Sequence, residues 1–391
     1  MKFNKWTLGL AAVGAVSMAS AVRADEAKLV ALNTALPSTT ISGYVDVAAQ
    51  YSPGNYSTAA GVPTGTSGAK VDNFTLNSFD VALDKPEDES PWAAGYHAEI
   101  NAGIDAVGVS LANSGNYSTA VRQAYVVLRT PVGNGIDWKL GVMDDVIGYE
   151  GNTDGLNPNY TRSIGYSIEP TTLVGLLASY KIIDAIQVQA GVANALSGPY
   201  GNGTATSPFV QNSSDKTFVA AVAFTAPDSF GFLKGAQLNL GTLLNVDKWG
   251  QDNYYAGLTI PTPLSALNFG AAFDYVSDNN AYGANSLNDS GWVAGLYTSF
   301  KATDKLSFNL RGEYYDLEGR PTFVNTITGP IYPGTNGKGE ELTATIEYDL
   351  WANVKSRAEF RWDHIDSGNA FSNTGGEANS YLLALNIIYT F

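Results

Sequence analysis

The sequence predicts an all-β protein, a closed antiparallel β-barrel of about 16 strands that crosses a membrane. Three observations support this. Strand-length segments with alternating apolar and polar residues recur along most of the chain. Their connections alternate between long polar loops and short turns. An apolar stretch typical of an export signal begins the chain, and no later apolar run reaches the ~18 residues of a transmembrane helix.

Composition narrows the possible functions. The chain has 37 acidic against 22 basic residues and a formal charge of −15, which disfavours nucleic acid as a partner. It has no cysteine, so it forms no disulfide or thiolate metal site. There are two histidines and no G-x-S-x-G or H-E-x-x-H motif. We therefore expect a protein without catalytic residues, metal or cofactor.

The N-terminal residues have the pattern of a secretory signal peptide. Lys2 and Lys5 precede the apolar residues 8–16, and small residues allow cleavage after Ala21 or Ala24. The predicted organisation is a signal peptide at 1–24, a periplasmic arm at 25–40 and a transmembrane barrel at 41–391.

The last segment, residues 379–391, shows the alternation clearly. Tyr381, Leu383, Leu385, Ile387, Tyr389 and Phe391 share one parity and would form a wholly apolar face. The other parity is mixed. A transmembrane strand fits this pattern, and so, for this strand alone, does the inner strand of a soluble β-sandwich.

Sixteen such segments follow residue 40, and a count of 14 or 18 stays open. Long loops after odd-numbered segments and short turns after even-numbered ones favour a barrel with both chain ends in the periplasm. A barrel of this size is wide enough to hold water. The predicted segments are 41–52, 73–85, 92–106, 119–130, 136–146, 171–181, 185–196, 215–226, 235–247, 251–261, 264–277, 289–301, 306–317, 338–350, 354–366 and 379–391.

Charged residues line the inward parity of three neighbouring segments, 306–317, 338–350 and 354–366. Charge on the lipid face costs about 2–4 kcal/mol for a midplane Arg or Lys, so these residues should face water. Two interpretations remain open: a pore wall that orients polar solutes, or ion pairs that only stiffen the barrel. The predicted pore-lining residues here are Arg311, Glu313, Glu347, Asp349, Lys355, Arg357, Glu359, Arg361 and Asp363.

Other segments also place charged residues on the inward parity. Glu99 and Lys139 are the predicted pore-lining residues among them. Because most of the group is acidic, we expect a weak preference for cations. The remaining inward candidates are Asp46, Asp80, His97, Asp137 and Asp274.

The longest interruption of the pattern is residues 147–170, a segment rich in tyrosine. Loops of this length in a compact domain usually have a function. We expect it to fold into the barrel and narrow it, with Glu150, Asp154 and Arg162 near the constriction. An ordinary external loop is the alternative.

Several stretches resemble a known family. They are RQAYVVLRT, GYEGNTDGLNPNYTRSIGYSIEPTTLVGLLASY, LRGEYYD, RAEFRWDH and the final aromatic strand, and the most specific part is 157–163. Together they resemble the OmpL-like putative β-barrel porins over nearly all the mature chain. The resemblance implies a Gram-negative outer-membrane porin that passes small solutes, and it assigns no solute-binding residues.

The expected function is a water-filled channel for passive diffusion, with outer-membrane lipids, small polar solutes and ions as partners. A substrate-specific channel is the nearest alternative. A barrel that serves mainly as an adhesin or structural anchor is another, and a soluble secreted sandwich is the third. A homotrimer is compatible with the sequence, which contains no interface signature.

Overall fold

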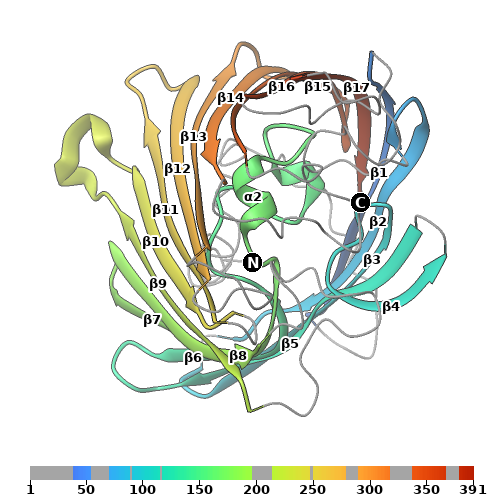
Figure 1. The fold of residues 1–391 in the computed structure, drawn as a ribbon. Helices are drawn as coiled ribbons and strands as arrows, with labels where there is room; N and C mark the ends of the chain where they lie inside the picture. The colour runs from blue at the N-terminus through green and yellow to red at the C-terminus, as the bar shows by residue number, and fades with distance from the viewer. Residues whose placement is uncertain are drawn as a thin grey trace.

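The computed structural model describes residues 38–391 except 54–69, 89, 115–116, 196–213, 247–249, 279–288, 318–336 and 367–377. The predicted signal peptide and the predicted arm before residue 38 lie outside the described residues. The described chain forms a closed antiparallel barrel of 16 strands, as the sequence predicted (Figure 1).

Each predicted segment corresponds to one strand of the barrel, with small differences at the ends. The strands are β1 (Thr40–Tyr51), β2 (Phe74–Lys85), β3 (Ala93–Gly103), β5 (Tyr117–Thr130), β6 (Ile136–Asp144), β7 (Thr172–Ile183), β8 (Ile186–Asn194), β9 (Lys216–Thr225), β10 (Gln237–Leu244), β11 (Gln251–Pro261), β12 (Leu267–Asp278), β13 (Asp289–Lys301), β14 (Leu306–Asp316), β15 (Lys338–Trp351), β16 (Val354–Ile365) and β17 (Asn379–Thr390).

A short additional strand, β4 (Val109–Ser114), lies in a stretch expected to be a loop. It forms a hairpin with the first residues of β5, along the edge that β6 leaves open because β6 pairs only from Ala124 onward. Six residues are too few for the alternation of apolar and polar side chains to stand out in a sequence.

The barrel closes where its first and last strands meet. β1 pairs with β2 on one side and with β17 on the other. Gly43 and Phe391 exchange two backbone hydrogen bonds of 3.0 and 2.9 Å, which fasten the C-terminal residue to the first strand. Within the described part of the chain, each of the 16 long strands therefore has a neighbour on both sides, as a sheet inside hydrocarbon requires.

The two faces of the wall have opposite character. On β17 the predicted apolar face is solvent-accessible in the isolated chain, whereas Ser380, Asn386 and Ile388 on the other face are buried. Since buried polar residues lie inside and exposed apolar residues outside, the outer face suits lipid. Among the described residues, no helix has the length and apolarity needed to cross a membrane.

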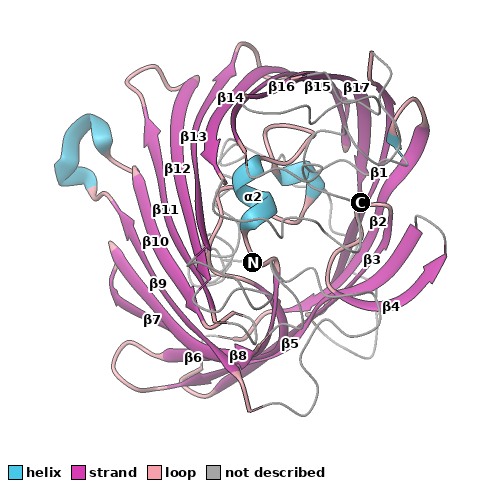
Figure 2. Cartoon of the chain, in the orientation of Figure 1, coloured by secondary structure: helices cyan, strands magenta, loops and turns pink. Residues whose placement is uncertain are grey.

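Residues 145–171, between β6 and β7, lie within the outline of the barrel and are called the inner loop below (Figures 1 and 2). The loop contains the 3-10 helix η3 (Asp154–Leu156) and the short helix α2 (Ile164–Ile168). A further 3-10 helix, η5 (Asp228–Leu233), lies in the turn between β9 and β10.

Apolar contacts hold both ends of the inner loop against the wall. Ile164 and Ile168 are fully buried against inward residues of β12, β13 and β14. Tyr149 stacks on Tyr297 of β13 with ring centroids 3.9 Å apart. Gly270 of β12 gives Tyr149 its space, since a side chain there would meet the tyrosine hydroxyl. Each buried large side chain stabilises this arrangement by about 1.5–3 kcal/mol.

Candidate functional site

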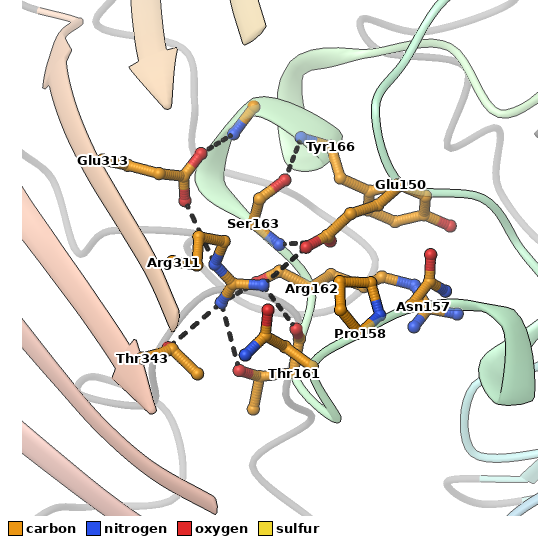
Figure 3. A network of polar contacts seen from close by, with 12 residues as sticks. Glu150, Asn157, Pro158, Thr161, Arg162, Ser163, Tyr166, Arg311, Glu313 and Thr343 are labelled. Atoms are coloured by element: carbon orange, nitrogen blue, oxygen red, sulfur yellow. Dashed lines mark hydrogen bonds and ion pairs between the residues drawn. The ribbon is translucent and has the colours of Figure 1, made fainter. Parts of the chain in front are cut away.

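The inner loop is fixed to the wall by Arg311 of β14, whose side chain is completely buried (Figure 3). Its guanidinium donates to the Glu150 carboxylate at 2.6 Å and to the Thr161 carbonyl oxygen at 2.7 Å. On the wall it donates to Glu341 of β15 at 3.1 Å. A buried charge is stable only when paired and hydrogen-bonded, and this arginine satisfies both conditions by joining loop and wall.

Two carboxylates of the wall accept hydrogen bonds from the loop backbone. Glu313 accepts from the N–H groups of Ile164 and Gly165 at 2.6 and 3.1 Å. Glu359 accepts from those of Tyr160 and Thr161 at 2.5 and 2.9 Å. These N–H groups would otherwise be buried without partners, at a cost of about 1–3 kcal/mol each.

Two arginines of β16 bind the loop carbonyl groups in the same way. Arg361 donates to the Arg162 carbonyl oxygen at 2.6 Å. Arg357 donates to the carbonyl oxygens of Asp154 and Asn159 at 2.8 and 3.2 Å. The wall is therefore complementary to the loop backbone in this one conformation. Its acids accept from the backbone N–H groups, and its arginines donate to the backbone carbonyl groups.

The predicted constriction residues Glu150, Asp154 and Arg162 mainly contact other parts of the inner loop and the arginine that holds it. Arg162 forms an ion pair with Asp154 at 2.7 Å, and Glu150 accepts from the Ser163 N–H at 2.7 Å as well as from Arg311. Burial alone would lower the pKa of Arg162, and the Asp154 carboxylate reverses this and raises it. Burial also raises the pKa of Tyr160 to about 12. These side chains stabilise the loop in its docked position.

The predicted ladder of charges on β14–β16 lies on the inner face, and the inner loop covers much of it. Arg311, Arg361 and Asp363 are completely buried, and Arg361 pairs with Asp363 at 2.7 Å. Near the short turn after β15, Lys355 pairs with Glu347 at 3.1 Å and donates to the Gly155 carbonyl oxygen. Asp349 is exposed close to the end of β15. The buried members that contact the loop are Arg311, Glu313, Arg357, Glu359 and Arg361.

A cavity of about 560 Å³ lies on the other side of the inner loop, against the wall formed by β1–β8. Thr153 and Leu156 of the loop line it, and so do the predicted residues Glu99 and Lys139. Lys139 sits over the ring of Tyr125 with its Nζ 4.3 Å from the centroid. The barrel interior is therefore divided between a filled side and an open side.

Acidic groups dominate the polar lining of this cavity. His97 lies between Asp84 and Glu99, with ring nitrogens 3.2 and 3.1 Å from their carboxylates. Glu87 and Asp145 each have one buried carboxylate oxygen without a hydrogen-bond partner among the described residues. Burial raises the pKa of Glu87 to about 7, and the neighbouring Asp137 carboxylate adds to the shift.

Sequence reasoning missed Arg122, which pairs with Glu99 at 2.5 Å and with Asp144 at 2.8 Å in this wall. The reason is a β-bulge. Glu99 is opposite Gln123 and the next residue, Ile100, is opposite Val121, so Arg122 is the extra residue of β5. Parity fails across a bulge because two residues oppose one. The only signal in the sequence was an arginine that shares its parity with Ala124, Val126 and Leu128.

Residues 38–391 match the family described as putative beta-barrel porin-2, OmpL-like. No curated protein matches the chain significantly. Among solved structures, the outer-membrane channel DcaP of Acinetobacter baumannii is 14% identical with a TM-score of 0.61, covering 90% of this chain and 97% of DcaP.

Two other solved structures share the architecture. The anion-selective porin of Comamonas acidovorans is 11% identical with a TM-score of 0.56, covering 90% of this chain and 99% of its own. The trimer form of OmpT from Vibrio cholerae is 13% identical with a TM-score of 0.53. The match covers 90% of this chain and 99% of the OmpT chain. At these identities the likeness is one of fold.

Proposed function

The chain belongs to the OmpL-like family of putative β-barrel porins, and from this premise we propose that it forms a water-filled channel for passive diffusion of small hydrophilic solutes and ions. The observation that carries the proposal is the division of the interior. A docked inner loop fills one side, and a polar cavity of about 560 Å³ remains on the other.

In this proposal solutes pass between the inner loop and the wall of β1–β8. The tethers to Arg311, Glu359 and Arg361 hold the loop in place, so the loop narrows the barrel without blocking it. The predicted residues Glu99 and Lys139 would then contact the solute. The buried members of the ladder would act indirectly, by fixing the width of the passage.

The lining supports a preference for cations. Asp84, Glu87 and Glu99 border the cavity, and their carboxylates would attract a cation more strongly than an anion. The arginines of the opposite wall are neutralised by acids and covered by the loop, which reduces their effect on a passing anion.

Membership of the family supports a location in the outer membrane. Residues 1–24 would serve as the export signal, with cleavage after Ala21 or Ala24, and mass spectrometry of the purified protein would identify the site. OmpT, which shares the fold, has a trimer form, and this supports a homotrimer here. Porins are channels, and we assign no catalytic activity.

Liposome swelling tests the channel directly. Vesicles that contain the purified protein should swell in solutions of small sugars, with rates that fall as the sugar becomes larger. Protein-free vesicles are the control. A folded, membrane-inserted barrel that gives no swelling with any sugar would favour an adhesin or anchor. Uptake of one sugar at rates unrelated to size would favour a substrate-specific channel.

A further inference from the structure

A cluster of possible metal ligands lies on the outer face of the barrel, away from the channel. Glu340 of β15 and His364 of β16 are paired neighbours, and Asp366 follows at the end of β16. Their strand neighbours Glu341 and Asp363 point inward and are buried, so Glu340 and His364 point outward. One ligand atom from each of the three residues lies within 4.8 Å of the others.

The hydrogen bonds around His364 fix which ring nitrogen carries hydrogen. The indole Nε1 of Trp362 lies 2.9 Å from one side-chain atom of Asn379. Because an indole N–H can only donate, that atom must be the amide oxygen. The Nδ1 of His364 lies 3.0 Å from the same oxygen, so Nδ1 must be the donor.

The neutral imidazole therefore keeps its lone pair on Nε2, which faces carboxylates. Nε2 lies 3.8 Å from the Asp366 carboxylate oxygen, too far for a hydrogen bond. Trp362 stacks on the imidazole with centroids 5.8 Å apart and restricts its rotation. In metal-binding histidines, one ring nitrogen usually binds the metal while the other donates a hydrogen bond to an oxygen acceptor.

Glu340 provides a second, independent indication. Its Oε2 atom is buried and has no hydrogen-bond partner among the described residues. A carboxylate oxygen buried without a partner is costly, and a bound cation would satisfy it. The third residue, Asp366, is exposed and can adjust its position.

We propose that Glu340, His364 and Asp366 bind a divalent transition-metal ion such as Zn²⁺ on the outer rim of β15 and β16. One imidazole and two carboxylates suit zinc, whereas magnesium and calcium prefer oxygen ligands alone. Ligands about 2.0–2.2 Å from a shared zinc ion lie at most about 4.4 Å apart, so small side-chain rotations complete the site. Three protein ligands leave a coordination position open to water or another group.

The test uses the full mature protein without a tag, folded in detergent, and Zn²⁺ as the probe. Calorimetric titration should show one site, with Mg²⁺ and Ca²⁺ competing poorly. His364→Gln and Glu340→Gln should each weaken zinc binding by at least about tenfold. The chain contains two histidines, so His97→Gln is a matched control and should leave the affinity unchanged.

A spectroscopic measurement separates a bound ion from a simple ion pair. With Cu²⁺ in place of Zn²⁺, electron paramagnetic resonance should show coupling to nitrogen from one imidazole in the wild-type protein and in His97→Gln. If His364→Gln does not fold, the zinc affinity of Glu340→Gln and the copper spectrum of the wild-type protein still test the proposal. Absence of zinc binding, binding that survives His364→Gln, or binding lost in His97→Gln would overturn the proposal.

Discussion

At the scale of single residues, the buried charged side chains of the interior hold the inner loop against the barrel wall. Arg311 joins Glu150 of the inner loop to Glu341 of the wall, and all three side chains are completely buried. Removing such a group is strongly destabilising, because the acids that remain are buried and lose a cationic partner. Arg311 is therefore the residue whose loss should affect the inner loop most.

We predict that Arg311→Met destabilises the folded barrel by about 3–5 kcal/mol, since it leaves the buried Glu150 carboxylate without its ion-pair partner and leaves Glu341 with Arg361 alone. Urea unfolding in detergent micelles measures the change. Lys234→Ala is the control: its pair with Asp228, 2.9 Å apart, is exposed in the η5 turn, and its loss should change stability by less than about 1 kcal/mol. Equal effects of the two substitutions would contradict the role of Arg311.

Glu87 should make the ion preference depend on pH. Its pKa is raised to about 7, so the carboxyl is largely neutral at pH 5 and charged at pH 8. Cation preference should therefore increase from pH 5 to pH 8 in the wild-type protein. The Glu87→Gln variant should not show this increase. The folded protein holds a proton that the unfolded chain releases near pH 4.5, so this group's contribution to stability falls as pH rises toward 7. An unchanged pH profile in Glu87→Gln would exclude it as the source.

At the scale of elements, the strands were predictable and the docking of the loop was only partly so. Alternation identified β17 and β11 almost to the residue, because one face of each strand is apolar. Parity also assigned Arg311 and Glu359 to the interior. It could not indicate that both bind the inner loop, since their partners lie about 150 or more residues away along the chain.

Local irregularities were the other limit. The bulge at Arg122 brings two successive residues of β5 toward the interior, and a strict alternation of faces cannot describe this. The strand β4 was missed because its pairing depends on β5 and hardly on its own six residues. Arg122 lines the cavity, so the bulge is the irregularity that made the sequence-based prediction of the candidate site incomplete.

Removal of the inner loop's tip tests the loop as an element. Deletion of residues 152–160 removes η3, both carbonyl groups bound by Arg357 and one of the two N–H groups bound by Glu359, so single-channel conductance should increase. The control is Lys234→Ala in the exposed η5 turn, which should leave conductance unchanged. A deletion variant that folds and conducts like the wild type would mean that the loop does not narrow the channel.

At the scale of the whole molecule, apolar and charged side chains are distributed in the opposite way to a soluble protein. Apolar side chains such as Leu385 cover the outside, and acids and arginines fill or line the inside. A closed wall satisfies the backbone in lipid, and the docked loop leaves a cavity with an acidic lining beside it. The formal charge of −15 agrees with a channel that favours cations.

The reversal potential of single channels in a potassium chloride gradient tests this account most directly. The purified protein in a planar bilayer should give discrete conductance steps, and the sign of the reversal potential should show that potassium passes more readily than chloride. A protein that inserts and gives no steps would contradict the channel. Steps with chloride preference would contradict the acidic passage between the inner loop and β1–β8.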